Sequence, residues 1–211
     1  MLPAVTTAVP PEAAKVFGSR LPLAERYAAA LAGDGIVRGL LGPREAEVVW
    51  DRHLLNCAVV AELAPESASV LDVGSGAGLP GLPMALARSD LRVTLLEPLE
   101  RRVAFLGETV AALGIEGQVA VVRGRAEDRA VAPADVVTAR ALAPLPRLIG
   151  WTVPLVAAGG CVLAVRGARA ADEVEEAARD LGRAGVVAEV VVCGGTLLDV
   201  PTTVVCLRRA A

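Results

Sequence analysis

A glycine-rich segment with an acidic residue before it is the part of the chain best suited to chemistry. Residues 70–81 read Val-Leu-Asp-Val-Gly-Ser-Gly-Ala-Gly-Leu-Pro-Gly. The apolar residues before Gly74 predict a buried strand, and the glycines allow positive φ and leave the backbone open to a ligand. A helix is predicted to follow, with Pro80 and Pro83 in its first turn, where a missing N–H costs little. The pattern indicates a nucleotide-like ligand at the turn.

The register of the glycines distinguishes two kinds of ligand. A dinucleotide fingerprint, G-x-G-x-x-G, fits residues 76–81. The turn, however, begins earlier, at Gly74, and in that register Leu79 stands where the third glycine would be. Asp72, at the strand end, would repel a pyrophosphate and attract the cationic amino-acid end of S-adenosylmethionine. The register and this acid favour S-adenosylmethionine. The glycines predicted to bind it are Gly74, Gly76 and Gly78.

Two more acidic positions follow later strands. Residues 91–96 predict the next parallel strand, and Glu97 ends it at the spacing where a carboxylate accepts hydrogen bonds from ribose hydroxyls. A third strand within residues 116–128 leads to Glu127 and Asp128, placed to meet the amine of an adenine. Each acid alone has a plainer interpretation: Asp72 as a turn or capping residue, Glu97 as a solvated strand terminus, and the last pair as a helix N-terminus. Their common strand-end position favours a ligand site.

The elements that position these residues fall into two parts. Residues 1–64 are expected to form a helical N-terminal extension, its first few residues disordered, with helices at 11–18, 21–31 and 43–63. Residues 65–211 are expected to form an α/β domain, because alternating strands and helices predict a parallel sheet. Its later strands are predicted at 135–139, 161–165, 186–192 and 203–207, and its later helices at 99–113, 144–156 and 170–181.

Composition bounds the function. The 211 residues suffice for one α/β domain with a modest extension, and no run of about eighteen apolar residues predicts a membrane span. The sequence does not begin with a basic segment followed by an apolar core, so a cytoplasmic protein without a secretory signal is expected. A net charge of −3 argues against a surface that binds nucleic acid everywhere but is compatible with a local basic patch.

Cysteine and histidine do not predict a metal site. The cysteines show no C-x-x-C spacing and His53 is the one histidine, so free, mostly buried thiols are expected and a metal is not. The cysteines are Cys57, Cys161, Cys193 and Cys206. Almost all positive charge is arginine, Lys15 being the one lysine. Arginines near predicted strand ends would border a ligand crevice or lie solvated on loops. They are Arg101, Arg102, Arg123, Arg125, Arg140, Arg166 and Arg169.

Residues 72–83 closely resemble the glycine motif of the ribosomal RNA small-subunit methyltransferase G family, also called the glucose-inhibited division protein B family. Supporting segments are residues 52–57, 95–98, 101–106, 124–127, 140–141 and 165–167. The resemblance runs from about Tyr27 to the C-terminus. It implies a Rossmann-like class I S-adenosylmethionine-dependent methyltransferase that methylates N7 of a guanine in 16S ribosomal RNA. The implied partner is this RNA or the small ribosomal subunit, and a monomer is expected.

The resemblance also implies roles for individual residues. Arg140 and Arg166 are the candidate catalytic residues, the second as a contact to RNA phosphate or base, because arginine does not serve as a base. The resemblance implies that Gly74 and Leu79 contact the donor and that Glu97 contacts its ribose. It also implies that Ala126 and Glu127 contact its adenine and that Arg140 lines the site.

The chain departs from the family pattern at several of these positions. Ala139 stands in place of a serine, Arg166 in place of a lysine, and Asn56–Cys57 in place of an aspartate–serine pair. His53 could approach the substrate, or could pack as a helix residue, since no partner for it is visible in the sequence.

Guanine N7 carries an in-plane lone pair and no proton, so its methylation needs neither a general base nor a covalent intermediate. The rate would come from alignment and electrostatics. No polar-proline-aromatic motif for amine methylation is evident, and Cys161 lies in an apolar segment. The glycine motif does not identify the acceptor. A methyltransferase for a small molecule or protein, a nicotinamide-dependent reductase and a non-catalytic nucleotide-binding module therefore stay open.

Overall fold

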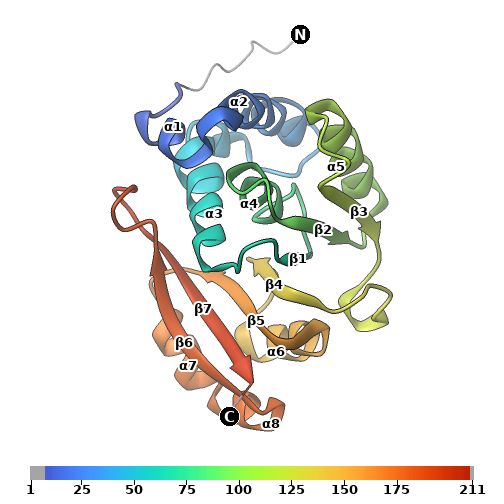
Figure 1. The fold of residues 1–211 in the computed structure, drawn as a ribbon, viewed down its shortest axis with the longest axis vertical. Helices are drawn as coiled ribbons and strands as arrows, with labels where there is room; N and C mark the ends of the chain where they lie inside the picture. The colour runs from blue at the N-terminus through green and yellow to red at the C-terminus, as the bar shows by residue number, and fades with distance from the viewer. Residues whose placement is uncertain (1–7, 210–211) are drawn as a thin grey trace.

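The computed structural model describes residues 8–209, in which a seven-stranded sheet carries helices on both faces (Figure 1). The expected disorder of the first few residues falls outside this part. The strands are β1 (Ser69–Val73), β2 (Arg92–Glu97), β3 (Val119–Arg123), β4 (Ala134–Arg140), β5 (Val156–Arg166), β6 (Val186–Cys193) and β7 (Thr202–Arg209). The α-helices are α1 (Pro11–Phe17), α2 (Leu21–Ala30), α3 (Asn56–Ala58), α4 (Gly81–Ala87), α5 (Glu100–Leu113), α6 (Leu145–Thr152), α7 (Ala170–Glu176) and α8 (Ala178–Ala184).

The strand order is β3-β2-β1-β4-β5-β7-β6. Strands β1 to β5 are parallel, whereas β7 runs antiparallel to both β5 and β6. The expectation of a parallel sheet throughout is therefore wrong at β7, because β6 returns directly into β7 through a loop without a helix. The strands that follow β1 in the chain, β2 and β3, lie on one side of it, and β4 lies on its other side. In such sheets a ligand crevice forms at this switch point, outside the carboxyl ends of the strands.

Several predicted helices are shorter or divided. The helix expected at 43–63 begins as a separate 3₁₀ turn, η3 (Pro43–Ala46), and continues after a break as η4 (Val49–Leu55), α3 and η5 (Val59–Leu63). The helix expected at 170–181 is two helices, α7 and α8. The helix expected at 144–156 ends in η7 (Val153–Leu155), and β5 begins at the next residue. The helix at 99–113 is confirmed, and Gly114 ends it in the left-handed conformation. The remaining short elements are η1 (Gly18–Arg20), η2 (Leu31–Gly35) and η6 (Ala126–Asp128).

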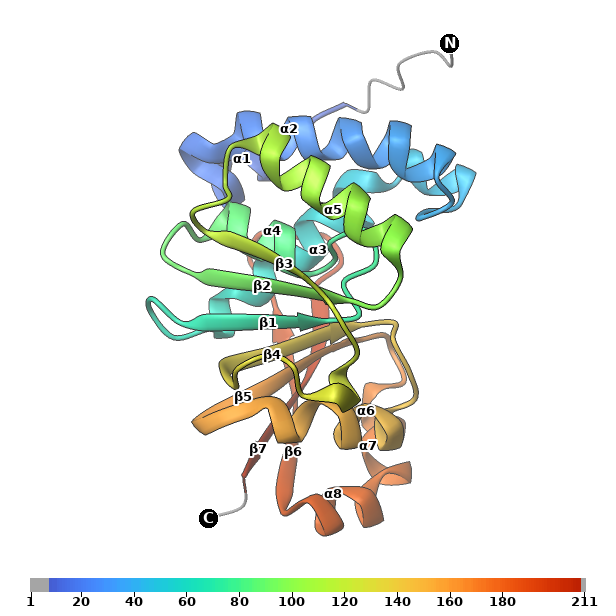
Figure 2. The same cartoon turned by 90° about the vertical axis from the view of Figure 1, so that its right-hand side faces the viewer.

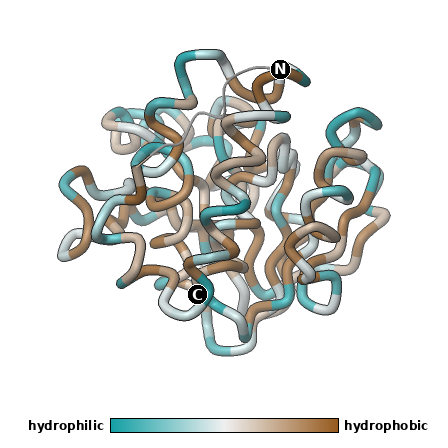
Figure 3. The backbone as a smooth tube through the Cα atoms, turned by 90° about the horizontal axis from the view of Figure 1, so that it is seen from above, coloured by the Kyte–Doolittle hydropathy of each residue, from teal (hydrophilic) through white to brown (hydrophobic). Residues whose placement is uncertain are grey.

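The N-terminal helices share one core with the sheet. Figure 2 shows α1, α2, α4 and α5 on one side of the strands and α6, α7 and α8 on the other. Buried Tyr27 and Leu54 belong to the same apolar cluster as Leu82 of α4, Leu95 of β2 and Phe105 of α5. In Figure 3 the brown, hydrophobic parts of the tube gather inside and the teal parts lie mostly at the periphery. Residues 8–64 thus form a covering layer of the α/β domain.

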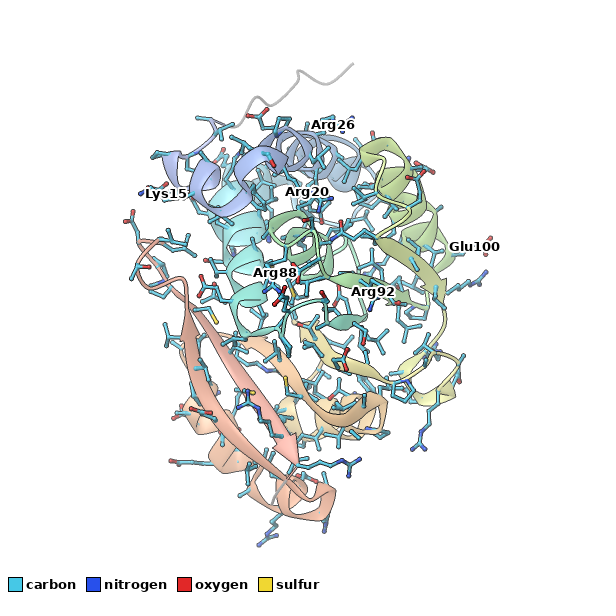
Figure 4. All side chains as sticks on the ribbon, viewed as in Figure 1. Lys15, Arg20, Arg26, Arg88, Arg92 and Glu100 are labelled. Carbon is cyan, nitrogen blue, oxygen red and sulfur yellow. The ribbon has the colours of Figure 1, made fainter. Side chains whose placement is uncertain are left out.

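Arginines join this layer to the sheet. Arg20 donates to the Ala85 carbonyl at 2.9 Å, and Arg88 donates to the Ala61 carbonyl at 3.1 Å. Both arginines are labelled in Figure 4, Arg20 near the N-terminal helices and α4, and Arg88 below α4. Charge-assisted bonds to helix-end carbonyls are stronger than neutral ones. They help to fix the helical layer above the glycine turn.

Candidate functional site

The glycine turn follows β1 and has the left-handed backbone that the sequence predicts. The φ angles of Gly74, Gly76 and Gly78 are 70°, 57° and 102°. A Cβ at Gly74 would lie 2.5 Å from Leu142 Cδ1, and one at Gly78 would lie 3.0 Å from the Tyr27 hydroxyl. Gly76 therefore faces the open side of the turn and Gly74 faces Leu142, whereas Gly78 faces inward. Its lack of a side chain is explained by packing beneath the turn.

The start of α4 has no free amide for a pyrophosphate. The Gly81 N–H donates to Asp72 Oδ2 at 3.0 Å, the Leu82 N–H to the Gly78 carbonyl at 2.8 Å, and Pro83 has no N–H. The first two of these residues are buried. A dinucleotide fold instead offers these amides to phosphate oxygens. The geometry argues against a dinucleotide and agrees with the register of the glycines.

Asp72 lies beneath the turn. It is fully buried, its Oδ2 accepts the Gly81 N–H, and its backbone carbonyl accepts the Ser75 hydroxyl at 2.9 Å. Burial raises the pKa of Asp72 to about 7, and the nearby Glu97 adds to the rise. Its other oxygen, Oδ1, is buried without a partner among the described residues. This placement fits the interpretation of Asp72 as a turn residue; it does not put the carboxylate in contact with a bound ligand.

Glu97 holds the other side of the turn. Its Oε2 accepts the Gly76 N–H at 2.9 Å and its Oε1 accepts the Leu99 N–H at 3.0 Å, with the Arg102 guanidinium 3.7 Å away. The side chain is 1% exposed, so the expectation of a solvated strand terminus is wrong. Each carboxylate oxygen keeps a second lone pair. Glu97 can therefore fix the turn and still accept a hydroxyl.

Two hollows meet at Gly74. One, the turn hollow, has a volume of about 360 Å³ and lies above the glycines. The other, the apolar hollow, has a volume of about 120 Å³ and includes the predicted adenine residues Ala126 and Glu127. Leu142 lines both and separates them. Further lining residues of the turn hollow are Ser75, Gly76, Leu79, His53, Arg102 and Arg140, and those of the apolar hollow are Val73, Leu96, Pro98, Arg125 and Trp151.

Leu142 is a site residue that sequence reasoning missed, and Trp151 is one of the five aromatic residues of the chain. Leu142 follows β4 at the switch point, after Ala141 with a φ of 51°. Trp151 comes from α6, and Arg147 lies over its ring at 5.9 Å. Neither stands in a motif, and only the strand-end position after β4 could have drawn attention to Leu142.

A third hollow brings the two candidate catalytic arginines together. This arginine hollow, of about 530 Å³, is lined by Arg140 at the end of β4 and Arg166 at the end of β5. Arg140 and Ala141 also line the turn hollow, so the two hollows are adjacent and Arg140 stands between them. Other lining residues are Arg52, Asn56, Gly167, Thr202 and Thr203.

Arg140 is held by two residues of the helical layer. Its Nη1 donates to Cys57 Sγ at 3.0 Å, and its Nη2 lies 3.0 Å from His53 Nδ1. The His53 Nε2 lies 2.6 Å from Glu45 Oε2. Because Arg140 can only donate, Nδ1 must accept and Nε2 must carry the proton that Glu45 receives. The expectation of a histidine without a partner is wrong: His53 has two. The chain Glu45–His53–Arg140 orients the guanidinium with several N–H groups still free.

This chain predicts an acid limb in the activity of the protein. Burial and the charge of Arg140 lower the pKa of His53, against the opposing effect of Glu45, while Arg52 adds to the lowering. His53 is thus neutral at pH 7 and gains its proton only below its usual value of about 6.5. Protonation removes the acceptor for Arg140 and places a like charge beside it. We expect turnover to fall between pH 7.5 and 5.5, by less than about tenfold because the lowered pKa keeps part of His53 neutral at pH 5.5.

The control is His53→Gln, whose amide oxygen accepts a hydrogen bond without titrating in this range. Its pH–rate profile should be flat where the wild-type profile falls, with donor affinity measured at both pH values. An identical acid limb in both proteins would remove His53 from this role.

Arg166 is a mostly buried cation, and two of its guanidinium nitrogens have no hydrogen-bond partner among residues 8–209. Its side chain is 9% exposed, and Nε lies 3.5 Å from Glu173 Oε2 without hydrogen-bond geometry. Nη2 also has no partner among residues 8–209. Burial lowers the pKa of Arg166, although arginine remains charged at neutral pH. Donors without acceptors at the rim of a hollow suit an anionic ligand.

The other strand-end arginines divide between the hollows and the surface. Arg102 and Arg125 line the turn and apolar hollows, as predicted for a crevice. Arg123 pairs with Glu100 at 3.0 Å, and Arg169 pairs with Glu176 at 2.8 Å, both largely exposed. Arg101 is exposed on α5. All four cysteines are buried and free, as expected, and three lie in strands. No helix in residues 8–209 is long and apolar enough to cross a membrane.

The chain is similar to known proteins along most of its length. Residues 20–198 match the model of a protein family described as rRNA small subunit methyltransferase G. A ribosomal RNA small subunit methyltransferase G of Thermobifida fusca is 55% identical over 200 residues, covering 93% of this chain and 84% of the relative. One of Salinispora tropica is 55% identical over 218 residues, covering 98% of this chain and 90% of the relative.

Solved structures share the fold. The pyocyanin biosynthetic protein PhzM aligns with a TM-score of 0.62 at 19% identity, over 87% of this chain and 61% of its own. P. horikoshii TYW2, in complex with MeSAdo, aligns with a TM-score of 0.57 at 17% identity, over 74% of this chain and 62% of its own. The predicted class I, Rossmann-like sheet is confirmed.

Proposed function

The chain belongs to the rRNA small subunit methyltransferase G family, and we propose that it transfers a methyl group from S-adenosylmethionine to N7 of a guanine in 16S ribosomal RNA. The observation that carries this proposal is the position of Arg140 between the turn hollow and the arginine hollow. One hollow suits the donor and the other suits a nucleotide. The arginine between them is held by hydrogen bonds.

The residues present fit S-adenosylmethionine. Gly76 leaves space above the turn, Glu97 offers oxygen lone pairs beside it, and the apolar hollow accepts a flat ring against Trp151. A donor reaching both hollows must pass Gly74, where Leu142 now lies. We propose that the Leu142 side chain shifts when the donor binds. The bound group supplies an electrophilic methyl on a sulfonium.

The protein's own part in the reaction is positioning and electrostatics. Gly74 and Gly76 let the backbone approach the donor, and Glu97 orients it through a ribose hydroxyl. Arg140 and Arg166 bind the RNA strand and orient the guanine so that its N7 lone pair faces the methyl. No side chain needs to remove a proton because N7 carries none. Positive charge moves from donor to base in this step, and alignment of the two accounts for the rate.

Replacing Glu97 with glutamine should weaken the binding of the methyl donor. The loss of carboxylate acceptors in a buried site should cost about 1–3 kcal/mol of affinity for S-adenosylmethionine. Calorimetry with S-adenosylmethionine and with NADH makes the measurement. The wild type should bind the first and not the second. Tighter binding of NADH would instead support a reductase, and unchanged affinity in the variant would limit Glu97 to holding the turn.

Arg166→Ala should weaken RNA binding while donor affinity stays the same. Each arginine that contacts a phosphate releases counterions, so the slope of log affinity against log salt should become shallower by about one unit. Arg179→Ala is the matched control, because Arg179 is exposed on α8, away from the hollows. Equal slopes for both variants and the wild type would make Arg166 a structural residue.

We further propose an oligomeric state and a cellular location for the protein. We propose a monomer as the active form. An enzyme acting on ribosomal RNA or the small subunit works in the cytoplasm, which we propose as its location. A small-molecule or protein acceptor is less well supported, because three arginines border the arginine hollow.

A further inference from the structure

A groove beside the arginine hollow has a chemistry unlike that of an RNA surface. This valine groove, of about 660 Å³, lies between the start of α1, helix η4 with α3, and the loop joining β6 to β7. Figure 1 shows that loop beside α3. The groove shares Arg52, Asn56 and Val200 with the arginine hollow, so both open on one continuous surface.

The groove exposes apolar side chains. Val200 is 73% exposed and Val48 is 36% exposed, and Leu55 and Leu198 lie between them in the lining. Branched aliphatic side chains exposed together in a concave surface are typical of a site that receives an apolar anchor from a partner.

The rim of the groove is acidic. Glu12, Asp51 and Asp199 line it, the first partly buried and the other two exposed, and none enters an ion pair within residues 8–209. The one cation, Arg52, is paired with Glu45 at 3.2 Å. Unpaired carboxylates repel phosphate and attract lysine and arginine. RNA is therefore a poor occupant, and a basic peptide is a good one.

We propose that the valine groove binds a basic peptide segment with an aliphatic anchor, carried by a protein on the RNA substrate. Proteins that bind ribosomal RNA neutralise phosphates with lysine and arginine, so they present such segments beside it. The inference rests on the proposed function, because that function places ribosomal RNA in the adjoining arginine hollow. The groove would then distinguish an assembled subunit from naked RNA.

The test uses purified small ribosomal subunits and protein-free 16S ribosomal RNA. A photo-cross-linking amino acid replaces Val48, which is exposed in the groove and does not line the arginine hollow. Irradiation should join it to a subunit protein, at a segment containing lysine or arginine and an aliphatic residue. A cross-link to RNA, one to a second copy of this chain, or none would overturn the proposal.

A charge variant provides the second measurement. The combined change Glu12→Gln, Asp51→Asn and Asp199→Asn should weaken binding to the subunits about tenfold and leave binding to naked RNA unchanged or tighter. Glu116→Gln is the control, because Glu116 is exposed before β3, outside the groove. Equal affinity of the combined variant and wild type for subunits would overturn the proposal. Methylation by the wild type in the same samples tests the proposed function separately.

Discussion

Replacing Arg140 with alanine should lower the rate of methyl transfer about 100- to 1,000-fold and leave the fold intact. This is the loss expected when a preorganised donor of hydrogen bonds is removed from a reacting centre. Arg140 lines the turn hollow and the arginine hollow at once, and Cys57 and His53 hold it at 3.0 Å each. Single-turnover methylation of small-subunit RNA, with donor affinity from calorimetry, makes the measurement. Donor affinity should fall as well, because Arg140 borders that hollow.

Arg140→Lys is the matched variant. Lysine keeps the charge but cannot reach Cys57 and His53 through two nitrogens at once. Its activity should lie between the wild type and the alanine variant. Full activity in Arg140→Ala, with circular dichroism unchanged, would show that neither RNA nor the donor depends on this side chain.

The largest effect on stability is expected for Gly81→Ala. A Cβ there would lie 2.6 Å from Leu95 Cδ2 and 2.8 Å from Asp72 Oδ2, both fully buried. Overpacking and a disturbed hydrogen bond to Asp72 should lower the free energy of unfolding by about 2–4 kcal/mol. Chemical denaturation gives this value directly.

Gly107→Ala is the control for this change. Gly107 lies inside α5, exposed, with no atom within 4 Å of an added Cβ. Alanine at this position should raise the free energy of unfolding of the protein by about 0.5–1 kcal/mol, since glycine costs more backbone entropy in a helix. If both variants had the same stability, the close approach of Gly81 to Asp72 would carry no energetic weight.

The sequence predicts the site to the level of strand ends but not of side-chain direction. The strand, the glycine turn, the acids at the ends of β1 and β2, and the acids that follow β3 lie where the pattern places them. The pattern cannot show that Asp72 and Glu97 turn back to accept backbone N–H groups. That choice depends on packing between α4, β1 and β2, which brings residues from distant parts of the chain together.

Long-range partners account for most of what the sequence leaves undetermined. His53 meets Arg140 from 87 residues away, and Glu45 reaches it from a separate 3₁₀ turn within a segment expected to be one helix. Alternation of strands and helices does not give strand direction either, so the antiparallel β7 is visible only in the sheet itself. Periodicity reports burial within an element, whereas these features depend on which elements become neighbours.

Mapping the modified nucleotide tests the central proposal most directly. Small ribosomal subunits lacking the modification are incubated with isotope-labelled S-adenosylmethionine and the protein, and the RNA is then digested and analysed by mass spectrometry. We expect one labelled 7-methylguanosine in 16S ribosomal RNA, absent when Arg140→Ala replaces the wild type. Label on another atom or base, on a protein or small molecule, or on nothing at all would contradict the proposal.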